Sequence, residues 1–287
     1  MPTTIPTTTS STRPGSPSAG DAYFETDTKS YIIYDGANWR GYASDGISGW
    51  SGTNAYYLSF DGVDDDLIAT TYDAGNEVGT TGSLSVSGWF KIPSAQLGSY
   101  TQVFYFGDSA TSSNYFAVNI QANETLRITL RKGAETDLVV SSTNTILADT
   151  WYNFVAVRSY SGTTCTATLY VNGTQWATGS ASNHDYEIGP LTRWSGFRGD
   201  FWSRSDQDEM AIYETALTSG QAVNIYKGES NGGSGGTNGT VGNLLSFNPA
   251  VWLRCGDGAE NGSGNTVYDM SLSNFNATRT GATYTSY

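Results

Sequence analysis

Acidic side chains gather at two places in this sequence, and they are its clearest candidates for chemistry. The two groups consist of Asp61, Asp64, Asp65 and Asp66, and of Asp206, Asp208 and Glu209. Carboxylates that crowd together repel one another and raise one another's pKa, and a bound cation removes that repulsion. Ca²⁺ takes about six to eight oxygen ligands from carboxylates, carbonyls and water. These residues therefore predict either a structural Ca²⁺ site or two turns with solvated aspartates.

A second candidate is a stretch near residue 195 in which aromatic side chains alternate with arginines. Its candidate binding residues are Arg193, Trp194, Phe197, Arg198 and Trp202. Aromatic rings beside arginines form anchors at protein interfaces and also platforms on which sugar rings stack. The alternative is a long strand pair whose aromatic residues belong to the core. If the stretch binds a partner, we favour protein contact over glycan contact.

Nucleophilic catalysis has little support in the sequence. His184 is the only histidine, so any Ser-His-Asp or Cys-His mechanism must use it. No G-x-S-x-G nucleophile elbow is present. We therefore interpret His184 as a loop histidine. Cys165 and Cys255 stand in strand-like segments and are expected to be buried free thiols, although the sequence leaves a disulfide between them open.

Composition excludes several classes of function. The 287 residues include 27 acidic and 14 basic side chains, which gives a formal net charge of −13. A chain this acidic lacks the basic field that phosphate backbones require, so we expect no nucleic-acid binding. No stretch approaches about 20 consecutive apolar residues, so we expect no membrane insertion. The N-terminus also lacks the basic and apolar regions of a secretory signal.

The elements that must position these residues are predicted to be strands. Across 55–228, apolar and polar residues alternate with a period of two, as where Arg127, Thr129 and Arg131 interleave with leucine and isoleucine. Gly, Asn and Asp turns separate these segments, and Asn172-Gly173 is the strongest hairpin signal. Many short strands at regular spacing indicate an antiparallel β-sandwich.

The two ends of the chain differ from this region. Residues 1–20 hold four of the 7 prolines and almost no apolar side chains. Such a segment cannot bury enough surface to offset its ordering entropy, so we expect an extended arm lying on a partner, with a disordered tail as the alternative. Residues 229–246 are rich in Gly, Asn and Ser and are predicted to form a flexible linker.

Residues 21–49 are predicted to form a small β-module. Two short apolar runs, around Tyr23 and from Tyr31 to Tyr34, flank a polar turn and indicate a hairpin, and Trp39 begins a third strand. From Gly20 to Trp39 the segment matches G-D-x-Y-F-x-T-D-T followed by Y-D-G-x-x-W. This pattern resembles a small module of phage tail fibres and other virion proteins.

Residues 50–228 carry four motifs of a known sandwich. They are LSFDGVDD at 58–65, LSVSGWF at 84–90, the stretch from WYN to LYVNG at 151–173, and DEMAIYETALT at 208–218. In this order they resemble the laminin G-like and concanavalin A-like jelly rolls. The resemblance implies an all-β fold: an antiparallel jelly-roll sandwich with a small N-terminal β-hairpin module and an extended arm. Fold alone does not imply an activity.

The same resemblance implies how the acidic groups are placed. In such proteins the FDG turn and the start of the Asp-Glu strand lie close together and often hold calcium. Carried over to this sequence, the metal ligands would be Asp61, Asp64, Asp206 and Asp208.

The Asp-Glu strand also resembles, in part, the catalytic strand of glycoside hydrolases of family 16, which share the jelly roll. Those enzymes carry three acids on one face of a strand, as E-x-D-x-E or E-x-D-x-x-E, and a retaining pair stands about 5–5.5 Å apart. Here Asp206 and Asp208 share a face, but Met210 follows them on it and Glu209 points the other way. The triad is broken, so we expect no enzyme.

Residues 247–287 form a C-terminal segment with an unusual place in the chain. In many laminin G-like proteins a W-x-x-x-x-D-G segment followed by Y-D-x-S precedes the FDG motif, whereas here it comes last. The segment therefore either closes the sandwich in cis, as a permuted domain, or docks on a neighbouring subunit. We favour the first and expect 251–253 to form a strand in which Trp252 is buried.

Together these features predict a phage virion structural protein, such as a tail fibre, an appendage or a capsid decoration protein. It would attach to other virion proteins through residues 1–46, be located on the virion and form a homo-oligomer. The sandwich would be displayed for adhesion to the host surface. The alternative is a carbohydrate-binding protein that engages host glycans, and a glycoside hydrolase is the weakest of the three.

Overall fold

The computed structural model describes residues 6–9, 11–26, 30–34, 39–42, 54–69, 71–107, 114–185, 188, 191–194, 204–229, 244–257, 262–271, 273 and 275–287. The chain forms two compact units, Met1–Ser51 and Gly52–Tyr287.

The N-terminal unit is a four-stranded sheet in the order β1-β2-β3-β4. Its strands are β1 (Thr7–Thr8), β2 (Ala22–Glu25), β3 (Ser30–Tyr34) and β4 (Trp39–Tyr42). Strands β2, β3 and β4 form an antiparallel meander, which contains the hairpin and the third strand expected from the sequence.

Within residues 1–20, the described residues 6–9 and 11–20 lie against their own unit, unlike the expected arm on a partner. Strand β1 pairs in parallel with β2, with Thr7 opposite Phe24, and Arg13 forms an ion pair with the buried carboxylate of Glu25. The described part of 1–20 is thus held by backbone pairing and by one ion pair within its own unit. Composition indicated that this segment could not form a core by itself, but a strand can be added to the edge of an existing sheet.

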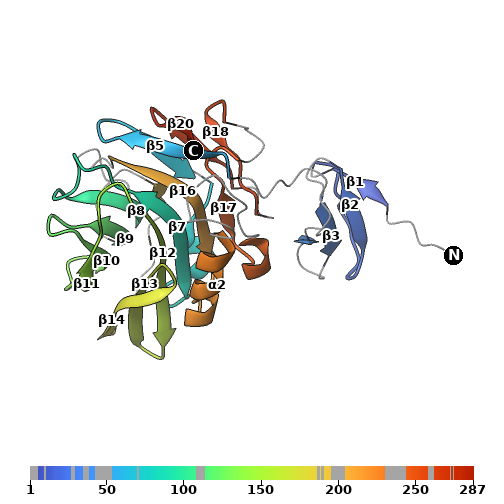
Figure 1. Cartoon of the computed structure of the whole chain (residues 1–287). Coiled ribbons are helices and arrows are strands. Elements are labelled where there is room, and N and C mark those ends of the chain that lie inside the picture. The colour runs from blue at the N-terminus through green and yellow to red at the C-terminus, as the bar shows by residue number, and fades with distance from the viewer. Residues whose placement is uncertain are drawn as a thin grey trace. The chain divides into compact units, whose positions relative to one another are not determined.

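The C-terminal unit is a sandwich of two antiparallel sheets, as the sequence predicted (Figure 1). The first sheet has the order β11-β10-β9-β8-β15-β6-β19-β18, and the second has the order β14-β13-β12-β7-β16-β5-β20, with β17 also paired to β16. The strands of the first sheet are β6 (Asp66–Ala69), β8 (Thr101–Gly107), β9 (Asn114–Ile120), β10 (Thr125–Lys132), β11 (Leu138–Thr145), β15 (Leu191–Trp194), β18 (Thr266–Val267) and β19 (Ala277–Thr280). Those of the second are β5 (Tyr56–Asp61), β7 (Leu84–Lys91), β12 (Trp151–Ser161), β13 (Thr164–Val171), β14 (Thr174–Ser182), β16 (Arg204–Tyr213), β17 (Val251–Leu253) and β20 (Thr283–Ser286).

Alternating side chains decide which face of each strand enters the core between the sheets. In β7, Leu84, Val86 and Phe90 belong to the core cluster, whereas Ser85 and Trp89 point to the outer face. Large aromatic residues of the first sheet pack together there, and Phe104 of β8 lies against Phe106 and Trp194 at ring-centre distances of 4.5 and 5.4 Å.

The outer face of the second sheet is covered by helix α2 (Ser219–Glu229) and the turn that leads to it. The ring of Trp89 lies 5.8 Å from that of Tyr226, and the hydroxyl of Ser85 donates to the carbonyl of Thr215 at 2.7 Å. This cover explains why β7 is buried on both faces. The other helices, α1 (Ala74–Val78) and the 3₁₀ helix η1 (Leu244–Phe247), are short. No helix in the described part of the chain is long and apolar enough to cross a membrane.

The C-terminal segment contributes strands to both sheets of its own chain. Strand β17 pairs with the second half of β16, β20 pairs with β5, and β19 pairs with β6. Trp252 is fully buried. The segment therefore closes the sandwich in cis, as expected, but the strand 251–253 lies beside β16, and β20 is the part that lies beside the strand that begins at Tyr56.

Candidate functional site

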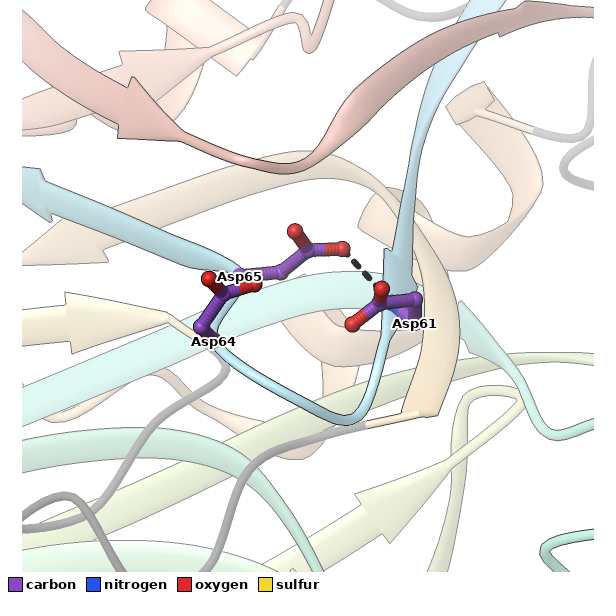
Figure 2. Close-up of side chains that lie close together, drawn as sticks. All are labelled: Asp61, Asp64 and Asp65. Atoms are coloured by element: carbon purple, nitrogen blue, oxygen red, sulfur yellow. Dashed lines mark hydrogen bonds between the residues drawn. The ribbon is translucent and has the colours of Figure 1, made fainter.

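Three aspartates meet at the turn between β5 and β6. The carboxylate oxygens of Asp61, Asp64 and Asp65 can all lie within 4.8 Å of one another (Figure 2). The Asp65 carboxylate accepts a hydrogen bond from the backbone N–H of Asp61 at 2.6 Å, and Asp61 accepts one from the N–H of Val63 at 2.7 Å. Burial raises the pKa of Asp65, and the charges of Asp61 and Asp64 raise it further. Three converging carboxylates of which two are exposed are a donor set suited to a hard cation such as Ca²⁺.

The other two expected metal ligands lie elsewhere. Asp61 stands opposite Arg204 on β16, and Asp208 is four residues further along that strand, about 13 Å away at 3.3 Å per residue. Asp206 is paired instead with Lys91, at 2.8 Å. The expectation that Asp206 and Asp208 share an ion with Asp61 is therefore wrong, because the strand register separates Asp208 from Asp61 and because Asp206 is held by Lys91.

Asp208 belongs to a buried polar cluster that fastens the C-terminal segment. Its Oδ2 accepts hydrogen bonds from Asn54 Nδ2 at 2.7 Å and from the Tyr287 hydroxyl at 2.6 Å. A bulge follows it in β16, where Glu209 adopts φ 49°. Full burial, together with the neighbouring carboxylate of Glu209, raises the pKa of Asp208 well above its usual range.

Glu209 is bound from the other side by the C-terminal segment. Its carboxylate accepts hydrogen bonds from Trp252 Nε1 at 2.6 Å and from Arg254 Nε at 3.0 Å. Both Asp208 and Glu209 have no exposed surface. These two acids therefore join strands rather than line a site that a ligand can reach.

The expected binding residues around 195 fall into two groups. Trp194 is a core residue, so the core alternative holds for it and its expected place in a binding surface is wrong. Arg193 points to the outer face of the first sheet, where its Nε lies 3.0 Å from Asp66 Oδ2. Phe197, Arg198 and Trp202 lie outside the described residues.

Arg193 is part of a polar face that the sequence did not single out. The side chains that point outward from β8, β9, β10 and β15 form what we call the arginine–tyrosine face, defined by Tyr105, Tyr115, Arg127, Thr129, Arg131 and Arg193. The strand register places Thr129 beside Ala117, Ala117 beside Tyr105, and Tyr105 beside Arg193. The rings of Tyr105 and Tyr115 lie 5.5 Å apart. The period-two pattern of β10 was visible in the sequence, but not which strands would lie next to it.

Several polar atoms of this face are buried without a hydrogen-bond partner. They are Thr129 Oγ1, Arg127 Nε and, beside the face, Asp66 Oδ1. Thr129 has 3% of its surface exposed, whereas Arg127 and Tyr115 are half-buried. Most buried polar atoms in proteins are paired, so a group of unpaired ones indicates a place where a ligand could supply the partners.

The remaining candidates are structural. His184 is buried, and its Nε2 lies 2.9 Å from the carbonyl oxygen of Leu130. Cys165 and Cys255 are both buried free thiols. Burial raises the pKa of Cys165 and thus disfavours its thiolate.

A family model described as the concanavalin A-like lectin/glucanases superfamily matches residues 61–222, more than half of the chain. The chain belongs to this superfamily. The matched region runs from the aspartate turn to helix α2 and so includes the arginine–tyrosine face. It ends before β17, although β17, β19 and β20 complete the sandwich.

Solved structures share this superfamily fold at low sequence identity. A candidate carbohydrate-binding protein of Bacteroides ovatus is 15% identical, with a TM-score of 0.55, over 94% of this chain and 70% of that one. A pentraxin of Limulus polyphemus is 17% identical over 66% of this chain and 88% of its own, with a TM-score of 0.46. The CBM40 domain of the Ruminococcus gnavus IT-sialidase is 12% identical over 59% of this chain and 96% of its own, also with a TM-score of 0.46. No curated protein matches the chain in sequence.

Proposed function

We propose that the sandwich is a carbohydrate-binding domain and that its ligand face is the arginine–tyrosine face. The observation that carries this proposal is the contrast between the two outer faces. Helix α2 packs on the second sheet through Trp89 and Tyr226, whereas the outer face of the first sheet carries half-buried arginine and tyrosine side chains beside the buried Tyr105 and Thr129. The superfamily contains lectins, and the Bacteroides ovatus protein of similar fold is itself described as carbohydrate-binding.

The chemistry of this face suits a sugar. A saccharide offers hydroxyl groups that donate and accept hydrogen bonds, and C–H faces that pack on aromatic rings. Tyrosine supplies a rigid ring with a polar tip, and arginine supplies up to five donors in a fixed geometry. The half-buried Tyr115 and Arg127 stand next to the buried, unpaired hydroxyl of Thr129.

A glycan array probed with the full-length chain tests this function. Tyr115→Ala should abolish the signal on the glycans that the wild type binds. Tyr268→Ala is the matched control, because this tyrosine is 40% exposed and lies outside the face. Equal binding by both variants, or no glycan bound by the wild type, would contradict the proposal.

The proposed role is binding without catalysis. The position on β16 that a third acid of a family 16 hydrolase would occupy is held by Met210, which is fully buried. Its sulfur fills the space that a side chain at Gly88 would need. Incubation of the bound glycans with the protein should therefore release no sugar.

A second proposed function concerns the N-terminal unit, which would attach the protein to a phage virion. This unit is compact by itself and carries the motif that resembles virion modules. In this proposal other virion proteins contact residues 1–46, the protein forms a homo-oligomer, and the sandwich is displayed on the particle as a tail fibre, appendage or decoration. Deletion of residues 1–51 should abolish incorporation into particles while glycan binding remains. Normal incorporation of the deletion variant would exclude this attachment.

A further inference from the structure

The three arginines of the arginine–tyrosine face differ in whether the chain itself neutralises them. Arg193 is paired with Asp66 at 3.0 Å, and Arg131 lies 3.7 Å from Asp137. Arg127 has no carboxylate partner among the described residues. Its hydrogen bond is to the hydroxyl of Tyr100, and its Nε is buried without a partner.

The surroundings of Arg127 form a built site rather than an isolated charge. Arg127 stands opposite Asn119 on β9 and opposite Ser141 on β11. Two residues along β10, on the same face, is Thr129, which is 3% exposed and has an unpaired hydroxyl. Side chains two residues apart on a strand are about 6.6 Å apart, which is about the width of one sugar ring.

The pattern of charges indicates the class of ligand. The charged side chains on or beside the described face are Arg127, Arg131, Arg193, Asp66 and Asp137, and the one without an opposite charge is an arginine. A guanidinium fits a carboxylate better than it fits a neutral hydroxyl, because two parallel charge-assisted hydrogen bonds can form. We propose that this face selects saccharides that carry a carboxylate, which binds Arg127 while Thr129 contacts the same sugar. This inference rests on the proposed carbohydrate-binding function and names its ligand class.

The experiment uses pairs of acidic oligosaccharides, each printed on an array beside its carboxyl-reduced counterpart, which has the same linkages without the charge. The wild-type full chain should prefer the carboxylated member of a pair by about 10- to 100-fold, the range expected for a hydrogen bond to a charged group. Arg127→Gln should remove that preference, because it should weaken binding of the carboxylated member only. The preference of the wild type should also fall as salt rises, because exposed charge pairs are screened.

Three further variants keep the test interpretable. Arg127→Lys retains the charge but not the paired donors, so it should keep only a small part of the preference. Thr129→Val should weaken binding of both members of each pair, since the hydroxyl contacts the sugar rather than the carboxylate. Arg204→Gln removes one exposed arginine from the other sheet and should change nothing.

Two results would overturn the inference, and they are distinguishable. Equal binding of both members of every pair, unaffected by Arg127→Gln, would refute the carboxylate selection and leave carbohydrate binding intact. Absence of binding to every member would refute both proposals together.

Discussion

Asp66 shows how one side chain can make stability depend on pH in this fold. Burial raises the pKa of Asp66 to about 6, although the neighbouring Arg193 opposes that rise. A carboxyl whose pKa is higher in the folded state than in the unfolded state holds its proton more tightly when folded. The contribution of Asp66 to the free energy of unfolding is therefore most favourable below about pH 4, and this contribution is lost as pH rises to about 6.

We predict that Asp66→Asn flattens this dependence. The free energy of unfolding of the wild type should fall between pH 4 and pH 6 by up to about 3 kcal/mol more than that of the variant. Urea denaturation at a series of pH values measures the difference. Asp64→Asn is the control, because Asp64 is exposed on the adjacent turn. Parallel curves for the wild type and Asp66→Asn would contradict the prediction.

The aspartate turn gives a second prediction at the scale of single residues. If Asp61, Asp64 and Asp65 hold Ca²⁺, then Ca²⁺ should raise the melting temperature, with a stabilisation of about 2.7 kcal/mol at a hundred times the dissociation constant. Asp64→Asn should lower this response in a thermal melt with and without chelator. Asp208→Asn should destabilise the protein by about 1–3 kcal/mol through its lost hydrogen bonds but respond to Ca²⁺ as the wild type does. If the Asp208→Asn variant did not respond to Ca²⁺, Asp208 would be a metal ligand after all, as the sequence predicted.

At the scale of elements, strand β17 is fixed to the sandwich both by backbone pairing and by side-chain hydrogen bonds. Its backbone pairs with β16, and the indole of Trp252 donates to the buried carboxylate of Glu209. The guanidinium of Arg254 reaches the same carboxylate from the residue after the strand. Loss of this short strand would therefore expose a core surface and leave Glu209 without its donors, which is costly for a buried charge.

We predict that Trp252→Ala lowers the free energy of unfolding by about 3–5 kcal/mol, as core truncations of large side chains do. Trp176→Ala is the matched control on the edge strand β14, where the tryptophan is only half-buried, and it should cost less.

Truncation after Gly228 should unfold the sandwich, because β17, β19 and β20 are removed together. A soluble and equally stable truncated monomer, measured by circular dichroism and light scattering, would show that these strands are dispensable.

At the scale of the whole molecule, the two compact units share no sheet among the described residues, because the N-terminal unit has one sheet and the C-terminal unit has the two sheets of the sandwich. We predict that residues 52–287 fold without the N-terminal unit, with the melting temperature of the sandwich changed by no more than about 2 °C. This shift corresponds to less than about 1 kcal/mol for a domain of this size. Calorimetry of the full chain and of the fragment measures it. A large loss of stability in the fragment would mean that the units stabilise each other.

The sequence alone determined those features that depend on neighbours along the chain. Period-two alternation in segments such as 126–131 identified strands, and Asn172-Gly173 marked a hairpin, because side-chain direction and turn geometry are local properties. The motif order correctly predicted that 251–253 forms a strand of the same sandwich with Trp252 buried, but this strand pairs with β16, and it is β20 that lies beside the strand that begins at Tyr56. The broad class, an all-β sandwich, followed from these patterns together.

Only the tertiary structure decided which residues meet across strands. Asp61 and Asp208 looked like partners in the sequence, but the register of β16 sets Asp61 opposite Arg204. The bulge at Glu209 and the burial of Asp208 could not be read from the sequence, since both depend on a C-terminal segment that pairs from a distance. Arg127, Thr129 and Arg193 form one face only because β8, β9, β10 and β15 are neighbours in the first sheet. Strand order is set by how the whole core packs, and the order of the strands in the sequence does not contain it.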